Sequence, residues 1–166
     1  MGLEKLKDVN DALGHDAGDQ LLIEGVNRLT DSVRGCDFVA RLGGDEFCVL
    51  LEGVSDEADI AVVAERCIGN LQQPITLSGK AVKPAGSIGI ARFPSDGSDA
   101  DELMQAGDNA MYAAKVAGHH RFEFFRKEMG QRAVDRLTIA QELRSALNNE
   151  EFRLHYQPQV DVRTGE

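Results

Sequence analysis

The sequence has 166 residues, 42% of them hydrophobic, which suits one domain with a hydrophobic core and an appendage. Its formal net charge of −10 provides no basic face for duplex nucleic acid, since that binding needs cations that neutralise phosphates. No apolar run approaches the roughly 20 residues of a membrane-spanning helix, and no secretory signal is visible at the N-terminus. We therefore expect a cytoplasmic protein in which Cys36, Cys48 and Cys67, which form no CxxC motif, are free thiols.

Hydrophobic periodicity divides most of the chain into alternating helices and strands. The expected elements, in chain order, are a helix at residues 16–34, two strands at 37–42 and 47–51, a helix from Ser55 to before Pro74, a short hairpin at 75–83, a strand at 87–93, a helix at 103–116 and a strand at 121–125. This alternation predicts an α/β or α+β domain in which helices pack on a sheet. Small residues in the helix at 103–116 would allow it to approach the sheet closely.

The composition changes after Phe125. Residues 126–151 are charged and have a helical pattern, with a narrow apolar stripe made of Ala133, Leu137, Ala140, Leu143 and Leu147. Residues 152–162 have the pattern of a strand that has no partner nearby in the sequence. We therefore expect a helical linker at 126–149 and the beginning of a second, truncated domain at 150–166.

The turn between the first two predicted strands carries the motif RLGGDEF. It places two carboxylates side by side, Asp45 and Glu46, after Gly43 and Gly44. Neighbouring carboxylates repel each other, and a hairpin turn requires only a pair such as Asn-Gly or Asp-Gly. Either the turn is a solvated tip with incidental acids, or the acids hold a cation.

Four motifs together point to one family. RLGGDEF, NDALGHDAGDQLL, SIGIA and MYAAKVAG occur in an order and at a spacing that resemble the GGDEF family of diguanylate cyclases, over about residues 5–124. The resemblance implies an α+β domain at 1–125 with a central, mostly antiparallel sheet flanked by helices, a nucleotidyl-cyclase-like fold with a ferredoxin-like core, plus a C-terminal linker helix. The C-terminal segment LRSALNNEEFRLHYQPQVDVRTGE resembles the opening of an EAL domain, the cyclic-di-GMP phosphodiesterase module that often follows GGDEF.

The resemblance also implies an activity. Cyclases of this family join two GTP molecules into cyclic di-GMP and release two pyrophosphates, with Mg²⁺ or Mn²⁺ and two chains facing each other. The implied partners are GTP, cyclic di-GMP, a second copy of the chain and an EAL domain in cis. Asp45 would be a metal ligand, and Glu46 would support the metal or the attacking ribose. Gly43 and Gly44 would let the substrate approach the backbone.

Other site residues follow from the same resemblance. Asn10 and Asp19 match the positions that read guanine, which an amide and a carboxylate can pair with. By themselves they would be a turn-forming side chain and a first-turn helix acid. Lys7 and Lys115 match lysines that contact phosphates and would otherwise be ordinary surface lysines.

The segment Arg34-Gly35-Cys36-Asp37 matches the RxxD inhibitory motif, which binds the product in this family. An arginine can pair with phosphate or stack on guanine, and an aspartate can accept from the guanine edge. Arg66 falls where a secondary contact to the same ligand occurs. The alternative is an exposed Arg–Asp pair at a helix end, worth at most about 1 kcal/mol.

The chain departs from the family pattern near its start and near residue 119. The family has an extra first helix and then a central strand with another metal-binding Asp, and Gly2 stands at the position of that Asp. Glu4 is the next acid but is not the expected ligand. His119 stands where the family usually has an Arg, and with His120 it has no third metal ligand at suitable spacing.

Three functions remain open from the sequence. With most of the central strand missing, we expect exposed sheet edges that favour association and little cyclase activity in this chain, although the parent protein makes cyclic di-GMP. Alternatively, the domain is a degenerate GTP or cyclic-di-GMP receptor that controls an attached EAL phosphodiesterase. A dimerising spacer would bind neither nucleotide.

Overall fold

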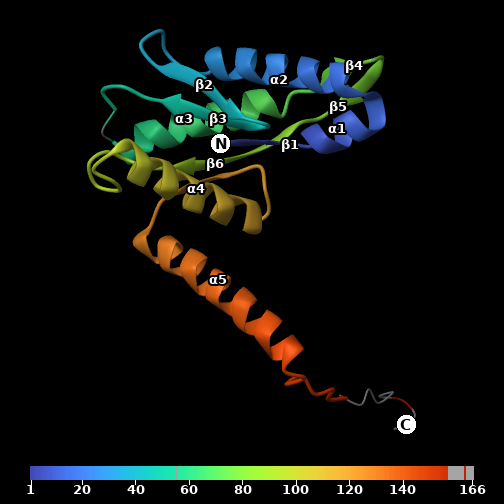
Figure 1. Cartoon of the computed structure of the whole chain (residues 1–166). Coiled ribbons are helices and arrows are strands. Elements are labelled where there is room, and N and C mark those ends of the chain that lie inside the picture. The colour runs from blue at the N-terminus through green and yellow to red at the C-terminus, as the bar shows by residue number, and fades with distance from the viewer. Residues whose placement is uncertain (55, 157–162, 164–166) are drawn as a thin grey trace. The chain divides into compact units, whose positions relative to one another are not determined.

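The computed structural model describes residues 1–54, 56–156 and 163, without the side chains of residues 132–137 and 140. The chain forms two compact units, Met1–Gly130 and Gln131–Glu166. The elements in chain order are β1 (Gly2–Glu4), α1 (Leu6–Leu13), α2 (His15–Thr30), β2 (Phe38–Gly43), β3 (Glu46–Leu50), α3 (Glu57–Leu71), β4 (Ile75–Leu77), β5 (Lys80–Val82), β6 (Ala85–Ile90), α4 (Ala100–Val116), β7 (Phe122–Phe124) and α5 (Lys127–Asn148) (Figure 1).

A five-stranded sheet in the order β2-β3-β1-β6-β7 forms the centre of the first unit. Its strands pair antiparallel except for β6 and β7, which are parallel. Helices α2 and α4 lie on opposite sides of this sheet (Figure 1). The predicted fold class, a mostly antiparallel sheet flanked by helices, is therefore confirmed. The predicted hairpin at 75–83 is present as β4 and β5, which form a separate small sheet.

Strand β1 occupies the centre of the sheet. Gly2 pairs with Glu46 of β3 on one side, and all three residues of β1 pair with β6 on the other. These three residues join the two halves of the sheet, but β1 pairs with β3 only at Gly2 and Glu46, so our expectation of exposed edges beside a shortened central strand stays a prediction. Helix α1, which the sequence did not predict, follows at once and buries Val9.

Caps and turns set helix boundaries that periodicity misplaced. Helix α2 ends at Thr30 rather than Arg34, and beyond its end Ser32 is buried and its hydroxyl donates to the carbonyl of Arg28. Helix α4 begins before residue 103, because the carboxylate of Asp99 accepts from the backbone N–H of Glu102. The predicted cap Ser55 lies outside the described residues, and Asp56 caps α3 instead.

Helix α4 packs closely on β6 at a glycine. A Cβ at Gly89 would lie 1.9 Å from the carbonyl oxygen of Gly107 and 2.2 Å from the backbone nitrogen of Met111. The side chains of Ala106, Ala110 and Ala114 are buried. The small residues of α4 therefore serve the close approach that their pattern predicted.

The C-terminal unit differs in part from the prediction. Residues 151–156 contain neither helix nor strand, so the strand predicted at 152–162 is wrong for 152–156, while 157–162 lie outside the described residues. A strand is stable only with partners, and the sequence had offered none. In the predicted stripe, Leu143 and Leu147 are exposed, and the side chains of Ala133, Leu137 and Ala140 lie outside the description. Among the helices that can be described, none has the length and hydropathy to cross a membrane.

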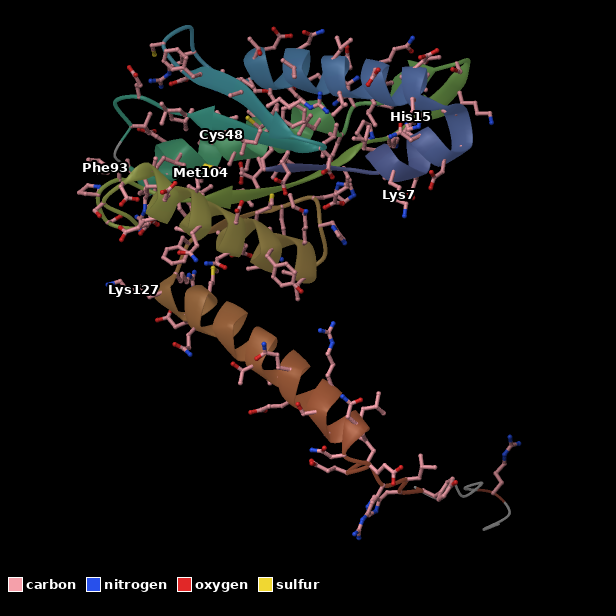
Figure 2. All side chains as sticks on the ribbon, viewed as in Figure 1. Lys7, His15, Cys48, Phe93, Met104 and Lys127 are labelled. Atoms are coloured by element: carbon pink, nitrogen blue, oxygen red, sulfur yellow. The ribbon has the colours of Figure 1, made fainter. Side chains whose placement is uncertain are left out.

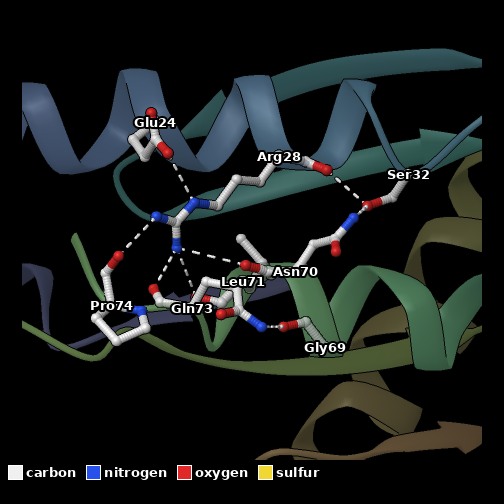
Figure 3. A network of polar contacts seen from close by, with 8 residues as sticks. All are labelled: Glu24, Arg28, Ser32, Gly69, Asn70, Leu71, Gln73 and Pro74. Atoms are coloured by element: carbon white, nitrogen blue, oxygen red, sulfur yellow. Dashed lines mark hydrogen bonds and ion pairs between the residues drawn. The ribbon is translucent and has the colours of Figure 1, made fainter.

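Arg28 of α2 closes the C-terminal end of α3 (Figure 3). Its guanidinium donates to the carbonyls of Asn70, Leu71, Gln73 and Pro74 and pairs with Glu24. The last carbonyls of a helix have no partner within the helix and carry partial negative charge, so an arginine there satisfies both their hydrogen bonding and their charge. This network joins α2 to α3 and to the chain that leads into β4.

Replacement of Arg28 by Ala should lower the free energy of unfolding by about 2 kcal/mol or more, because several carbonyls lose a charged donor. Urea denaturation would measure this. Arg121→Ala is the matched control, since Arg121 pairs with Glu123 and its side chain is 48% exposed, and its loss should cost less than about 1 kcal/mol. Equal losses for the two variants would contradict a structural role for Arg28.

Candidate functional site

Backbone pairing holds the β2–β3 turn beside β1. The backbone N–H of Leu3 donates to the carbonyl of Asp45 at 2.8 Å, and that of Phe47 donates to the carbonyl of Met1 at 2.9 Å. Gly43 pairs with Glu46, so Gly44 and Asp45 form the tip, where Gly44 has φ 53°. The guanidinium of Arg41 donates to the carbonyl of Gly44 at 3.0 and 2.7 Å. The two acids therefore lie on a turn that is fixed from both sides.

The carboxylates of Asp45 and Glu46 are available for a cation. Asp45 is half-buried and Glu46 is exposed, and within the described residues no side-chain hydrogen bond or ion pair engages either carboxylate. Divalent ions such as Mg²⁺ prefer oxygen ligands, so this pair could hold one such ion. The part of the chain that the structure describes contains no cluster of three or more His, Cys, Asp or Glu side chains placed to bind a metal.

Lys115 lies beside Gly2. The family resemblance predicts a second metal-binding carboxylate at this position. A Cβ at Gly2 would be 3.1 Å from Nζ of Lys115 and 3.4 Å from Sδ of Met111. Lys115 belongs to the last turn of α4 and is half-buried. The ammonium of Lys115 therefore lies next to the space that a side chain at residue 2 would enter.

The junction of α1 and α2 places Asn10 against Gly18, the residue before Asp19. Helix α1 ends where the backbone N–H of Gly14 donates to the carbonyl of Asn10. A Cβ at Gly18 would be only 1.9 Å from Oδ1 of Asn10, so the amide lies directly against the Gly18 backbone. This oxygen is buried and has no hydrogen-bond partner among the described residues. Asp19 follows Gly18 and is exposed.

The alternative interpretations of Asn10 and Asp19 do not hold in the structure. Asn10 lies within α1 rather than in a turn. Asp19 lies beyond the first turn of α2, whose first-turn acid is Asp16. The roles of Asn10 and Asp19 with guanine stay predictions. The sequence could not show that Gly18 makes room for the Asn10 amide, since that contact joins two helices.

Lys7 projects from α1 and is exposed (Figure 2). No contact within the described residues joins Lys7 to the β2–β3 turn, so its role with phosphate stays a prediction. Figure 2 also marks Cys48 on β3, one of the three cysteines, all of which are free thiols as expected.

The Arg34–Asp37 segment forms a preformed turn. The carboxylate of Asp37 accepts from the backbone N–H groups of Arg34 at 2.8 Å and Glu52 at 3.1 Å. The first of these bonds is the main reason why the pKa of Asp37 lies below its ordinary value. Arg34 is exposed, and no Arg34–Asp37 side-chain ion pair occurs among the described residues, while product binding at this turn stays a prediction. Arg66 donates from Nε to the carbonyl of Ser32 at 2.9 Å.

Glu4 connects β1 to β6 and to the segment after α4, a role that the sequence did not reveal. Its Oε1 accepts from the hydroxyl of Ser87 at 2.7 Å and lies 2.6 Å from Nδ1 of His119. Burial raises the pKa of Glu4, but the hydrogen bonds from Ser87 and His119 outweigh it, so the pKa lies below its ordinary value. The carboxylate of Glu4 is therefore occupied by contacts within the fold, and its contact with His119 joins that residue to β1.

Since the pKa of Glu4 is lowered by folding from its ordinary value of 4.5, its ionised form should stabilise the protein above that pH and lose this effect as the pH falls through the folded-state pKa. Glu4→Gln should therefore be less stable than the wild type at about pH 7, and the difference should be smaller at a pH below 4.5. Urea denaturation at both pH values would measure it, with the exposed acid Glu65→Gln as control. A difference that does not change with pH would contradict this role.

Comparison with known proteins decides the family. The model of the family "Diguanylate cyclase, GGDEF domain" matches residues 1–121. This chain belongs to the GGDEF family. The predicted family is thus confirmed, while the EAL opening at 150–166 remains a prediction.

Relatives and solved structures agree with this assignment. The chain is 44% identical over 165 residues to the bifunctional diguanylate cyclase/cyclic di-GMP phosphodiesterase MucR of Pseudomonas aeruginosa, covering 99% of this chain and 24% of MucR. It is 36% identical over 166 residues to the cyclic di-GMP phosphodiesterase NbdA of the same organism, covering 100% of this chain and 21% of NbdA. The crystal structure of the GGDEF domain of YfiN (TpbB) from P. aeruginosa matches with a TM-score of 0.71 at 38% identity, covering 75% of this chain and 78% of that one. The chain thus spans about a quarter or less of these two curated relatives.

Proposed function

We propose that this GGDEF domain binds GTP and belongs to a GGDEF–EAL protein that condenses two GTP molecules into cyclic di-GMP, and that the present chain has little turnover by itself. The observation that carries the proposal is the buried, unpartnered Oδ1 of Asn10 against Gly18. A buried acceptor without a donor costs free energy. A ligand that supplies a donor to this amide would remove that cost.

Guanine has the complementary chemistry at this end of the site. Its Watson–Crick edge presents N–H donors that an amide oxygen and a carboxylate can accept. Asn10 and Asp19 offer these two acceptors from adjacent helices, and Gly18 between them leaves room for the amide. Adenine lacks the donor that guanine carries at N1, so this arrangement supports selectivity for guanine.

The β2–β3 turn and α4 suit the phosphate end. In the condensation, a ribose 3′ hydroxyl loses its proton, its oxygen bonds to the α-phosphorus of a second GTP, and pyrophosphate leaves; the step occurs twice per cyclic di-GMP. A divalent ion bound at Asp45 and Glu46 would supply charge neutralisation at the phosphates. Lys115 and Lys7 would add cationic contacts to the phosphates. Since each chain holds one GTP, two copies must face each other.

A receptor function is the second candidate, and Gly2 favours it. Without a carboxylate at that position, a domain could bind the nucleotide and still turn it over poorly. The names of the relatives allow both functions, since MucR is described as bifunctional and NbdA as a phosphodiesterase. Turnover of GTP with Mn²⁺, compared with that of the full-length parent protein, would distinguish a cyclase from a receptor.

Gly18→Ala tests the guanine end. The new Cβ would overlap Oδ1 of Asn10 and displace the amide, so GTP affinity measured by calorimetry should fall at least about tenfold, or about 1.4 kcal/mol. Gly107→Ala is the matched control, because this helical glycine has open space at its Cβ position, and it should leave GTP affinity unchanged. Failure of the wild type to bind GTP would refute the proposal and favour the spacer function.

A pair of variants tests whether product binds at the Arg34–Asp37 turn. Arg34→Ala should weaken cyclic-di-GMP binding about tenfold or more, because a guanidinium that pairs with phosphate is lost, while GTP binding stays unchanged. Asp45→Ala should do the reverse. Calorimetric titration with each nucleotide would show the difference, and a parallel loss of both ligands in either variant would contradict two separate sites.

A further inference from the structure

We infer that this domain takes up one divalent ion with its nucleotide rather than two, because the ammonium of Lys115 occupies the place of a second ion. The inference rests on the proposed GTP site and concerns the cations that would surround the triphosphate. It concerns the side of the sheet that α4 covers, where Gly2, Glu46 and Lys115 meet.

Strand register brings these three positions together. Gly2 and Glu46 are directly paired across β1 and β3, so their side-chain positions lie on the same face of the sheet, about 5 Å apart. Nζ of Lys115 lies 3.1 Å from the Cβ position of Gly2. Any side chain at residue 2 would therefore point at the ammonium and lie next to the carboxylate of Glu46.

No side chain of β1 is free to supply an oxygen ligand for a second ion. Gly2 has no side chain, and the nearest other acid on β1, Glu4, already accepts from Ser87 and contacts His119. A divalent ion beside Lys115 would also be repelled by the ammonium, and this repulsion is strong where water is partly excluded. The ammonium itself supplies positive charge to the phosphates without coordination.

A site with one ion and the ammonium of Lys115 would bind the nucleotide but would not condense it efficiently. One ion at Asp45 and Glu46 together with Lys115 can neutralise much of a triphosphate. Activation of a 3′ hydroxyl is eased by a second divalent ion, which polarises the attacking oxygen more strongly than an ammonium can. Binding without efficient condensation therefore follows from a single substitution in the sheet.

The test counts bound Mn²⁺ by electron paramagnetic resonance in the presence of a saturating, unreactive GTP analogue with a methylene group between the α- and β-phosphorus atoms. The wild type should bind one ion per chain. Gly2→Asp should bind two, and Gly2→Asn, which has nearly the same shape without the charge, should bind one. Gly2→Asp combined with Lys115→Met covers the case in which the new carboxylate pairs with Lys115, and it too should bind two ions.

Two results would overturn the inference: two ions bound to the wild type with the analogue in place, or one ion in both Gly2→Asp and the double variant. Calorimetry with the same analogue separates these results from a failure of the proposed function. If the wild type binds no analogue, the proposed GTP site and the inference fail together. If it binds the analogue with two ions, only the inference fails.

Discussion

The backbone pairing of β1 with β3 and β6 is the constraint on which the sheet and the candidate site depend. This short strand joins the β2–β3 hairpin to the β6–β7 pair. It also fixes the turn, because the N–H of Leu3 donates to the carbonyl of Asp45. A hairpin without such a neighbour would be marginally stable at best. The acids of the turn therefore have a defined position only because residues 2–4 pair on both sides.

Polar groups of the candidate site have fewer partners than the buried polar groups in the rest of the fold, which is called the scaffold here. In the scaffold, buried or half-buried groups are paired: Arg28 satisfies the end of α3, and Glu4 pairs with Ser87 and His119. In the site, the oxygen of Asn10 has no described partner, and two carboxylates adjoin on one turn. Local arrangements that lower stability are expected where a ligand completes them. This contrast supports the proposed nucleotide site.

Substitutions at two family positions have related consequences around β1. Gly2 removes a carboxylate and leaves its space to Lys115. His119 replaces a cation that was expected to contact phosphate, and it turns instead to Glu4. This pattern supports the proposal that the domain binds GTP but turns it over poorly.

The sequence by itself determined the family, the fold class, the acidic turn and the β4–β5 hairpin. These depend on local signals, such as the glycine-rich turn before Glu46 and the residues Ser78 and Gly79 with positive φ. Only the tertiary structure decided that residues 2–4 form the central strand, that the Asn10 amide lies against Gly18, and that Lys115 stands beside Gly2. It also showed that 152–156 form no strand. These features arise from contacts, or from missing partners, between segments far apart in the chain, where local periodicity carries no information.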